Sequence, residues 1–248
     1  MMYEQMSYVY DELIGEAPYD DWLQFTIQLF EKHGIKGKHV ADVGAGTGEM
    51  SLRLAALGYD VTGIDYSNNM LRIAEQKAQQ KHLQINWIEQ DLRKLTGSKE
   101  YDAVVSYLDV INYIVDESDV RQVFHNIYHV LKENGIFIFD VHAIDFITEY
   151  YVEETFTNIR DDAAYIWSCL PGQYPGEMYH DLTFFLKEPN GLYRKFTEYH
   201  HQRTYAIEIY KYLLKEVGFQ NIEIYGDASI DMENSIEDAP RIFFLAKK

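Results

Sequence analysis

The chain has 248 residues, with 22 Lys or Arg against 40 Asp or Glu and a net charge of −18. A protein this acidic does not attract nucleic-acid phosphates over its whole surface, so we expect no nucleic-acid partner. The single Cys169 excludes an internal disulfide. The N-terminal segment lacks the pattern of a signal peptide, and no apolar run reaches the roughly 18 residues of a membrane span. We therefore expect a cytoplasmic protein without membrane contact.

Apolar strand segments and amphipathic helical segments alternate along the first part of the chain. After two expected helices at 3–14 and 22–30, the expected strands cover residues 39–43, 59–65, 84–90, 101–108 and 136–141. The helices between them begin at Glu49, Ser67 and Ser118, and the last is expected to stop at Asn134-Gly135. Strands joined by helices make parallel crossovers. With a final helix and two final strands after residue 206, the pattern predicts a doubly wound, seven-stranded, Rossmann-like α/β sheet.

Residues 150–205 break this alternation. They hold two or three aromatic, strand-like runs separated by Pro-Gly and Asn-Gly signals, with a hairpin turn expected at 187–191. We interpret the segment as an antiparallel β insertion after the fifth strand. The expected core is then 1–149 plus 206–248, with a helical cover at 1–34.

A glycine-rich loop, Gly44-Ala45-Gly46-Thr47-Gly48, follows the first expected strand. Open α/β sheets bind ligands at such a strand-to-helix junction. A dinucleotide site would need a third glycine where Glu49 stands, and Asp42 together with Glu49 would repel a pyrophosphate. The same carboxylates favour a ligand that carries an ammonium and a sulfonium. S-adenosylmethionine (SAM) is such a ligand. Because of the missing glycine and the two carboxylates, the loop disfavours an NAD-dependent dehydrogenase.

Two further acids stand at the ends of the next strands. Asp65 ends the second strand, where its carboxylate can accept both hydroxyls of a ribose, and Asp91 follows the third strand, where it can meet an adenine amine. Leu92 and Met70 offer apolar faces to the ring. Each acid also has a structural interpretation, since Asp65 could cap the helix from Ser67 and Asp91 could cap a turn.

Several segments resemble, in order and spacing, the motifs of class I SAM-dependent methyltransferases. They are VADVGAGTG, GIDYSNNML, EQDLRKL, YDAVVSYLDVINYI and VLKENGIFIFDVH, within about residues 40–142. The flanking segments resemble the YqeM-like branch of bacterial small-molecule methyltransferases, so the resemblance covers nearly the whole chain. It implies that SAM is the cofactor and S-adenosylhomocysteine (SAH) the product. The implied cofactor-binding residues are Asp42, Gly44, Ala45, Gly46, Gly48, Asp65, Tyr66, Met70, Asp91, Leu92 and the backbone of Tyr107 and Leu108.

Methyl transfer is an in-line displacement that mainly requires positioning, together with a base where the acceptor is protonated. Candidates for these roles follow the fourth and fifth strands. His142 is the His at a strand end and the expected general base. Asp109 and Tyr113 are the other catalytic candidates, and Asp109 could hold the methionine amino group or orient the acceptor. His142 could instead bond a loop, and Asp109 could cap a helix. No Asn-Pro-Pro-aromatic motif or metal-binding acid set appears here, so we expect neither a DNA base as acceptor nor a metal.

The insertion is the expected lid over the acceptor. Strand alternation would place His201, Arg203 and Tyr205 on one face and His200, Gln202 and Thr204 on the other. If the first set faces the cleft, Arg203 could clamp an anionic group. Expected substrate-binding residues are therefore His180, His201, Arg203 and Tyr205.

An aromatic residue, Tyr8, stands in the N-terminal segment and is expected to close over SAM. Relatives close over their cofactor with similar residues. The acceptor is expected to be a small molecule with an amine or a hydroxyl. Two alternatives stay open: a non-catalytic module that binds SAM or SAH, and an RNA methyltransferase, which the charge of −18 disfavours.

Overall fold

The structure is a computed structural model that describes residues 17–97, 101–230 and 236–248. The expected helix at 3–14 and Tyr8 lie outside these residues. Within them, no helix is both long and apolar enough to cross a membrane. The described residues also contain no group of three or more His, Cys, Asp or Glu side chains arranged to hold a metal ion.

The larger sheet has seven strands in the order β10-β11-β5-β4-β1-β2-β3. Its strands are β1 (His39–Val43), β2 (Asp60–Asp65), β3 (Asn86–Glu89), β4 (Tyr101–Ser106), β5 (Leu131–His142), β10 (Gln220–Gly226) and β11 (Arg241–Lys247). The first five are parallel, and β11 pairs antiparallel with both β5 and β10. The order reverses direction between β1 and β4, which is the point where such sheets bind ligands. The predicted doubly wound sheet is confirmed.

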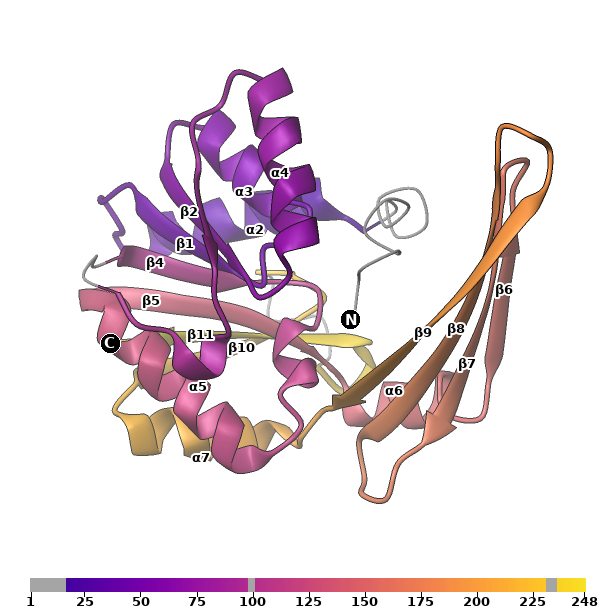
Figure 1. Ribbon diagram of the computed structural model, residues 1–248. Coiled ribbons are helices and arrows are strands. Elements are labelled where there is room, and N and C mark those ends of the chain that lie inside the picture. Colours follow the sequence, from indigo (N-terminus) through magenta and orange to yellow (C-terminus); the bar gives the residue numbers. More distant parts are fainter. Residues whose placement is uncertain (1–16, 98–100, 231–235) are drawn as a thin grey trace.

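Helices cover both faces of this sheet (Figure 1). They are α2 (Tyr19–Lys32), α3 (Glu49–Ala56), α4 (Asn68–Gln80), α5 (Glu117–Val130) and α7 (Ile207–Val217). Along β5 successive side chains alternate between the faces: Phe137 and Phe139 pack in the cluster with α5 and α7, while Ile136 and Ile138 pack in the cluster with α2 and α3. An apolar run that is buried on both faces is typical of a central parallel strand.

The helix α5 ends earlier than predicted. The sequence predicts a stop at Asn134-Gly135, but α5 ends at Val130 and β5 begins at Leu131. Leu131 pairs with Tyr101 of β4, and a register shift separates that pair from the regular ladder that starts at Ala103 and Ile136. Pairing with a neighbouring strand thus overrides the local turn signal.

The insertion forms a separate four-stranded antiparallel sheet, preceded by α6 (Ile144–Tyr150). Its strands are β6 (Thr155–Ile159), β7 (Ala163–Pro171), β8 (Glu177–Lys187) and β9 (Tyr193–Arg203). The expected turn after Lys187 is present, with Gly191 at φ +81° and the Asn190 side chain accepting from the Leu192 amide at 2.8 Å. The sequence analysis did not predict β6. This short edge strand has few apolar residues, none of its side chains is fully buried, and its last residue, Ile159, is exposed.

The smaller sheet stands beside the core and meets it at one end (Figure 1). Contacts at that end run from β9 to the short helix η3 (Val110–Tyr113), which follows β4. Asn112 of η3 donates to the carbonyl of Arg203 at 3.1 Å, and the Thr204 hydroxyl donates to the carbonyl of His142 at 2.6 Å. These bonds fix the insertion against the carboxyl edge of the larger sheet, on the side where β4 and β5 end.

Candidate active site

The glycine loop turns sharply after β1. Gly44, Gly46 and Gly48 all have positive φ, at +76°, +53° and +85°, which side chains with a Cβ rarely adopt. A Cβ at Gly44 would lie 2.4 Å from Val110, so this glycine allows η3 to approach the loop. A Cβ at Gly46 would meet nothing within 4 Å. Gly46 therefore leaves its backbone exposed to a ligand.

Asp65 ends β2 and points back to the glycine loop. Its Oδ2 accepts from the Gly46 amide at 2.9 Å, and its Oδ1 accepts from the Ser67 amide at 2.8 Å. Burial raises the pKa of this carboxyl, and backbone hydrogen bonds oppose the rise. Ser67 is the N-cap of α4, as predicted, with its hydroxyl accepting from the Met70 amide at 3.4 Å. Asp65 thus links the loop to the start of α4.

Asp42 and Glu49, the two acids beside the loop, are compensated differently. Asp42 is buried in β1 and accepts from the Ser51 hydroxyl at 2.6 Å, and burial raises its pKa to about 6. Burial would also raise the pKa of Glu49, but hydrogen bonds from Lys77 and Arg53 lower it overall. Glu49 is thus paired with cations, whereas the nearest partner of Asp42 is neutral.

Asp91 caps a turn, which was one of the two interpretations of this residue in the sequence analysis. It is the N-cap of a short helix, η2 (Leu92–Lys94), and accepts from the Arg93 amide at 2.9 Å. The Arg93 guanidinium lies 2.6 Å from Asp91 Oδ2, and this hydrogen bond lowers the pKa of Asp91. Leu92 is buried beside it, and Tyr66 is half exposed.

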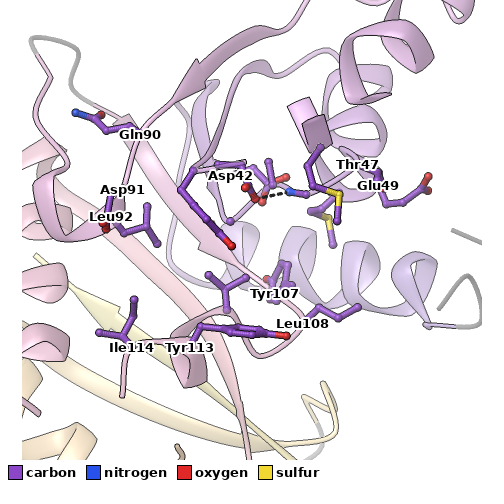
Figure 2. Close-up of a pocket in the computed structure, with 18 of the residues that line it drawn as sticks. Asp42, Thr47, Glu49, Gln90, Asp91, Leu92, Tyr107, Leu108, Tyr113 and Ile114 are labelled. Carbon is purple, nitrogen blue, oxygen red and sulfur yellow. Dashed lines mark hydrogen bonds between the residues drawn. The ribbon is translucent and has the colours of Figure 1, made fainter. Parts of the chain in front are cut away.

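A pocket of about 290 Å³ lies at this edge of the sheet (Figure 2). Of the described residues predicted to bind cofactor, it is lined by Asp42, Gly44, Ala45, Gly46, Asp65, Tyr66, Met70, Asp91, Leu92, Tyr107 and Leu108. Gly48 does not line the pocket. A Cβ at this position would lie 2.8 Å from the Trp87 ring, so the glycine allows α3, α4 and β3 to pack closely. Tyr113 also lines the pocket, and Figure 2 shows its ring beside Leu108. Glu49, whose charge the sequence analysis used, also lines the pocket, and the lining is completed by Tyr19, Thr47, Met50, Gln90, Arg93, Val110 and Ile114.

A buried cluster of charges lies where the two sheets meet. The Arg241 guanidinium at the start of β11 donates to Asp109 Oδ1 from two nitrogens at 3.1 Å, and it also donates to Asp140. Burial would raise the pKa of Asp109, but His142 and Arg241 hold it well below its usual range, whereas burial raises the pKa of Asp140. The sequence analysis assigned no role to Arg241, since nothing local marks it as the partner of acids more than 100 residues away.

Asp109 also ties the insertion to the core. Its Oδ2 accepts from Gln202 Nε2 at 2.6 Å, Gln202 Oε1 lies 2.9 Å from His180 Nε2, and Trp167 donates to His180 Nδ1 at 2.9 Å. His142 Nε2 lies 3.5 Å from Asp109 Oδ1. Neither Asp109 nor His142 is among the residues that line the pocket.

The strand alternation predicted for the insertion is present, but the second set faces the core. His200 and Gln202 are 4% and 2% exposed and point toward η3. Arg203 instead stacks over the rings of Tyr174 and Tyr205, at 4.7 and 4.4 Å from their centroids. The condition on which Arg203 would clamp a substrate is therefore not met.

The remaining predicted substrate residues lie apart from the pocket. His201 Nε2 lies 2.7 Å from Glu177 Oε1, and its ring stacks on Tyr179. The Tyr205 hydroxyl donates to the carbonyl of Val115 at 2.6 Å. His180 does face the core, but it does not line the pocket. Substrate roles for these residues stay predictions that the geometry does not favour.

Comparison with known proteins gives the family. Residues 40–135 match the family described as methyltransferase domain. A protein of Geobacillus sp. (strain WCH70) named "Putative methyltransferase" is 41% identical over 100% of both chains, and "Putative methyltransferase YqeM" of Bacillus subtilis (strain 168) is 38% identical over 100% of this chain and 98% of its own. The chain belongs to the class I SAM-dependent methyltransferases. Within them it falls in the YqeM-like branch.

A solved structure agrees with this assignment. A SAM-dependent methyltransferase from Clostridium acetobutylicum ATCC 824 superposes with a TM-score of 0.89 at 26% identity, over 99% of this chain and 98% of that one. SAM is therefore the cofactor of this methyltransferase. The pocket fits it: the open backbone at Gly46, the buried carboxylate of Asp65 and the apolar Met70 and Leu92 offer groups suited to an amino acid, a ribose and a purine.

Proposed function

We propose that this methyltransferase transfers a methyl group to an amine or hydroxyl of a small molecule by direct in-line displacement, without a metal. The observation that carries the proposal is the shared pocket, in which the glycine loop and Asp65 face Tyr113 and Leu108 across one cavity of about 290 Å³. A concave pocket lined by apolar side chains and a few polar groups is typical of a small-molecule site. The net charge of −18 also disfavours an RNA acceptor.

Within the proposal the cofactor would be held by the residues that the resemblance implies. Asp65 would accept from ribose hydroxyls, Asp42 would lie on the methionine side, and Met70 and Leu92 would contact the purine. When bound, SAM supplies a methyl carbon already activated by its sulfonium. The protein's own task is then to orient an acceptor and to exclude water.

The acceptor would enter beside η3. Tyr113 and Leu108 line the pocket there, and the insertion meets η3 on the other side. Asp109, behind them, would act by holding Gln202 and so positioning β9 rather than by touching the acceptor. His142 would add to that network through Asp109. In this arrangement the four-stranded sheet is the lid over the acceptor.

The experiment that tests this function begins with calorimetric titration of the purified protein with SAM and with SAH. We expect micromolar binding of both. The protein is then incubated with ¹³C-methyl SAM and the low-molecular-weight fraction of a bacterial extract, and labelled products are detected by NMR. Binding with label in small molecules supports the proposal. Binding without any labelled product supports a non-catalytic module, and label in added total RNA supports an RNA methyltransferase.

A further inference from the structure

Tyr113 is the residue through which the pocket reaches the insertion. It ends η3 and lines the pocket, and its hydroxyl lies 3.2 Å from Nδ1 of His200 on β9. The two rings also meet edge to face, with centroids 5.8 Å apart. A group bound in the pocket against Tyr113 is therefore connected to the buried face of the four-stranded sheet.

His200 lies between Tyr113 and a carboxylate. Its Nε2 is 3.4 Å from Glu198 Oε2, and the two side chains are only 3% and 6% exposed. This contact has ion-pair distance and is not a hydrogen bond, and the negative charge beside Nε2 favours the tautomer that carries its proton on that nitrogen, so that Nδ1 accepts from the Tyr113 hydroxyl. Carboxylate, imidazole and phenol thus stand in sequence, from the interior of the sheet to the pocket.

The charges around His200 permit this arrangement. His180 is its cross-strand partner on β8, and burial lowers the pKa of His180 to about 4, so His180 is neutral and does not repel a proton on His200. Asp109 and His142 act on His180 from the core side. Glu198 faces His200 directly.

The negative charge of Glu198 acts electrostatically on a residue that lines the pocket. Burial, then Asp65 and then Glu198 raise the pKa of Tyr66 to about 12, and Tyr66 lines the pocket. Among the described residues, Asp42 and Asp65 have no ion pair with Lys or Arg. The pocket and its acceptor side are therefore negative, which favours a cationic ligand over an anion.

We propose that Tyr113, His200 and Glu198 form a proton relay that deprotonates the acceptor, and that this acceptor is a small molecule with a protonated amino group. The inference rests on the proposed methyl transfer and names its substrate class. Tyr113 is the residue that touches the acceptor, while His200 and Glu198 act through it. An ammonium of ordinary pKa near 10 is within reach of an imidazole, whereas an aliphatic alcohol is far more weakly acidic.

In the relay step, one N–H bond of the acceptor's ammonium breaks and its proton passes to the Tyr113 oxygen. The proton of the Tyr113 hydroxyl passes to Nδ1 of His200, and Glu198 stabilises the imidazolium through Nε2. The freed nitrogen lone pair forms the bond to the methyl carbon as the carbon–sulfur bond breaks, with that electron pair going to sulfur. His200 returns its extra proton to solvent after product release.

The test compares His200→Gln, Tyr113→Phe and Glu198→Gln with wild type. His129→Gln, on the exposed surface of α5, is the matched control. Calorimetry should show SAM and SAH binding within about twofold of wild type for His200→Gln and Glu198→Gln, and circular dichroism should show folded protein for all four. Transfer from ¹³C-methyl SAM to the small-molecule extract is then followed between pH 6 and pH 9.

We expect His200→Gln and Tyr113→Phe to lower the transfer rate at pH 7 about 100-fold and Glu198→Gln about tenfold, with the control unchanged. In His200→Gln the rate should rise about tenfold per pH unit, because only free amine then reacts, whereas wild type should rise much less steeply. The ¹³C shift of the transferred methyl should be that of an N-methyl group. A purely structural role of His200 would not change the pH profile in this way.

Other outcomes overturn the relay and separate it from the parent function. If the wild type transfers methyl groups and His200→Gln has the same rate and pH profile, the relay alone is overturned. If the products are O-methylated, the assignment of an amine acceptor is overturned. SAM binding without transfer in wild type overturns the proposed function and the relay with it.

Discussion

The pocket and the junction between the two sheets both bury aspartates, but they satisfy them with different partners. In the pocket, Asp65 accepts from two backbone amides and Asp42 from a hydroxyl. In the junction, Asp109 and Asp140 share the guanidinium of Arg241. Neutral donors keep a carboxylate in place without cancelling its charge, whereas a cation cancels it.

This difference indicates what each region is for. The pocket retains negative charge, which a ligand with a sulfonium and an ammonium can neutralise on binding. In the junction, Arg241 of β11 pairs with Asp140 of β5 and with Asp109, so these charges hold β11, β5 and the insertion together. A buried charge left without a cation thus points to a ligand, and one that a cation of the protein pairs points to architecture.

The largest expected effect lies in the junction. Arg241→Met would leave Asp109 and Asp140 buried without the guanidinium that they share, and we expect the free energy of unfolding to fall by about 3–5 kcal/mol. Urea denaturation followed by circular dichroism measures it. The control is Arg93→Met, whose pair with Asp91 is half exposed and should cost about 0–1 kcal/mol. Equal losses in both variants would remove the distinction between the junction and a surface ion pair.

In the pocket, by contrast, replacing a charged residue should raise the stability of the protein. Asp42 has a pKa raised by burial from 3.8 to about 6, so the folded state binds its proton more tightly than the unfolded state does. Stability from Asp42 is therefore present below pH 4 and is lost as the pH rises to about 6, by about 2–3 kcal/mol. Asp42→Asn should be spared this loss, so the variant should gain stability over wild type across that window.

Urea unfolding at intervals from pH 3.5 to pH 7 checks this expectation. The control is Asp60→Asn, at the exposed start of β2. A difference between Asp42→Asn and wild type that does not depend on pH would mean that the Asp42 charge is compensated in the pocket, as the charges of the junction are.

Contacts between residues that are close in the sequence could be predicted, whereas contacts between residues that are far apart in the sequence could not. Asp65 and Gly46 are 19 residues apart and lie at adjacent strand ends, which the strand–helix alternation predicts directly. Arg241 and Asp109 are 132 residues apart, and Gln202 and Asp109 are 93 apart, so no local pattern links them. The alternation of β9 was predictable, but which face points inward depends on η3 in the folded chain.

A smaller effect is expected on cofactor affinity. Asp65→Asn keeps the shape of the side chain but loses its charge and turns an acceptor toward a donor, which should cost about 2 kcal/mol in SAM binding, or about thirtyfold in Kd. Calorimetry measures this loss. Asp60→Asn at the other end of β2 should bind as wild type does. Unchanged affinity in Asp65→Asn would show that the charge at this strand end serves the glycine loop alone.

The smallest expected effect separates backbone strain from ligand contact. Gly46 and Gly34 both have positive φ, +53° and +66°, and a Cβ would meet nothing within 4 Å at either. Changing either glycine to Ala should therefore lower stability by about 1 kcal/mol. Because Gly46 lines the pocket and Gly34 lies in an exposed turn, only Gly46→Ala should also weaken SAM binding, and SAM should accordingly raise its melting temperature less than that of Gly34→Ala. Equal stabilisation of both by SAM would place the cofactor away from the loop.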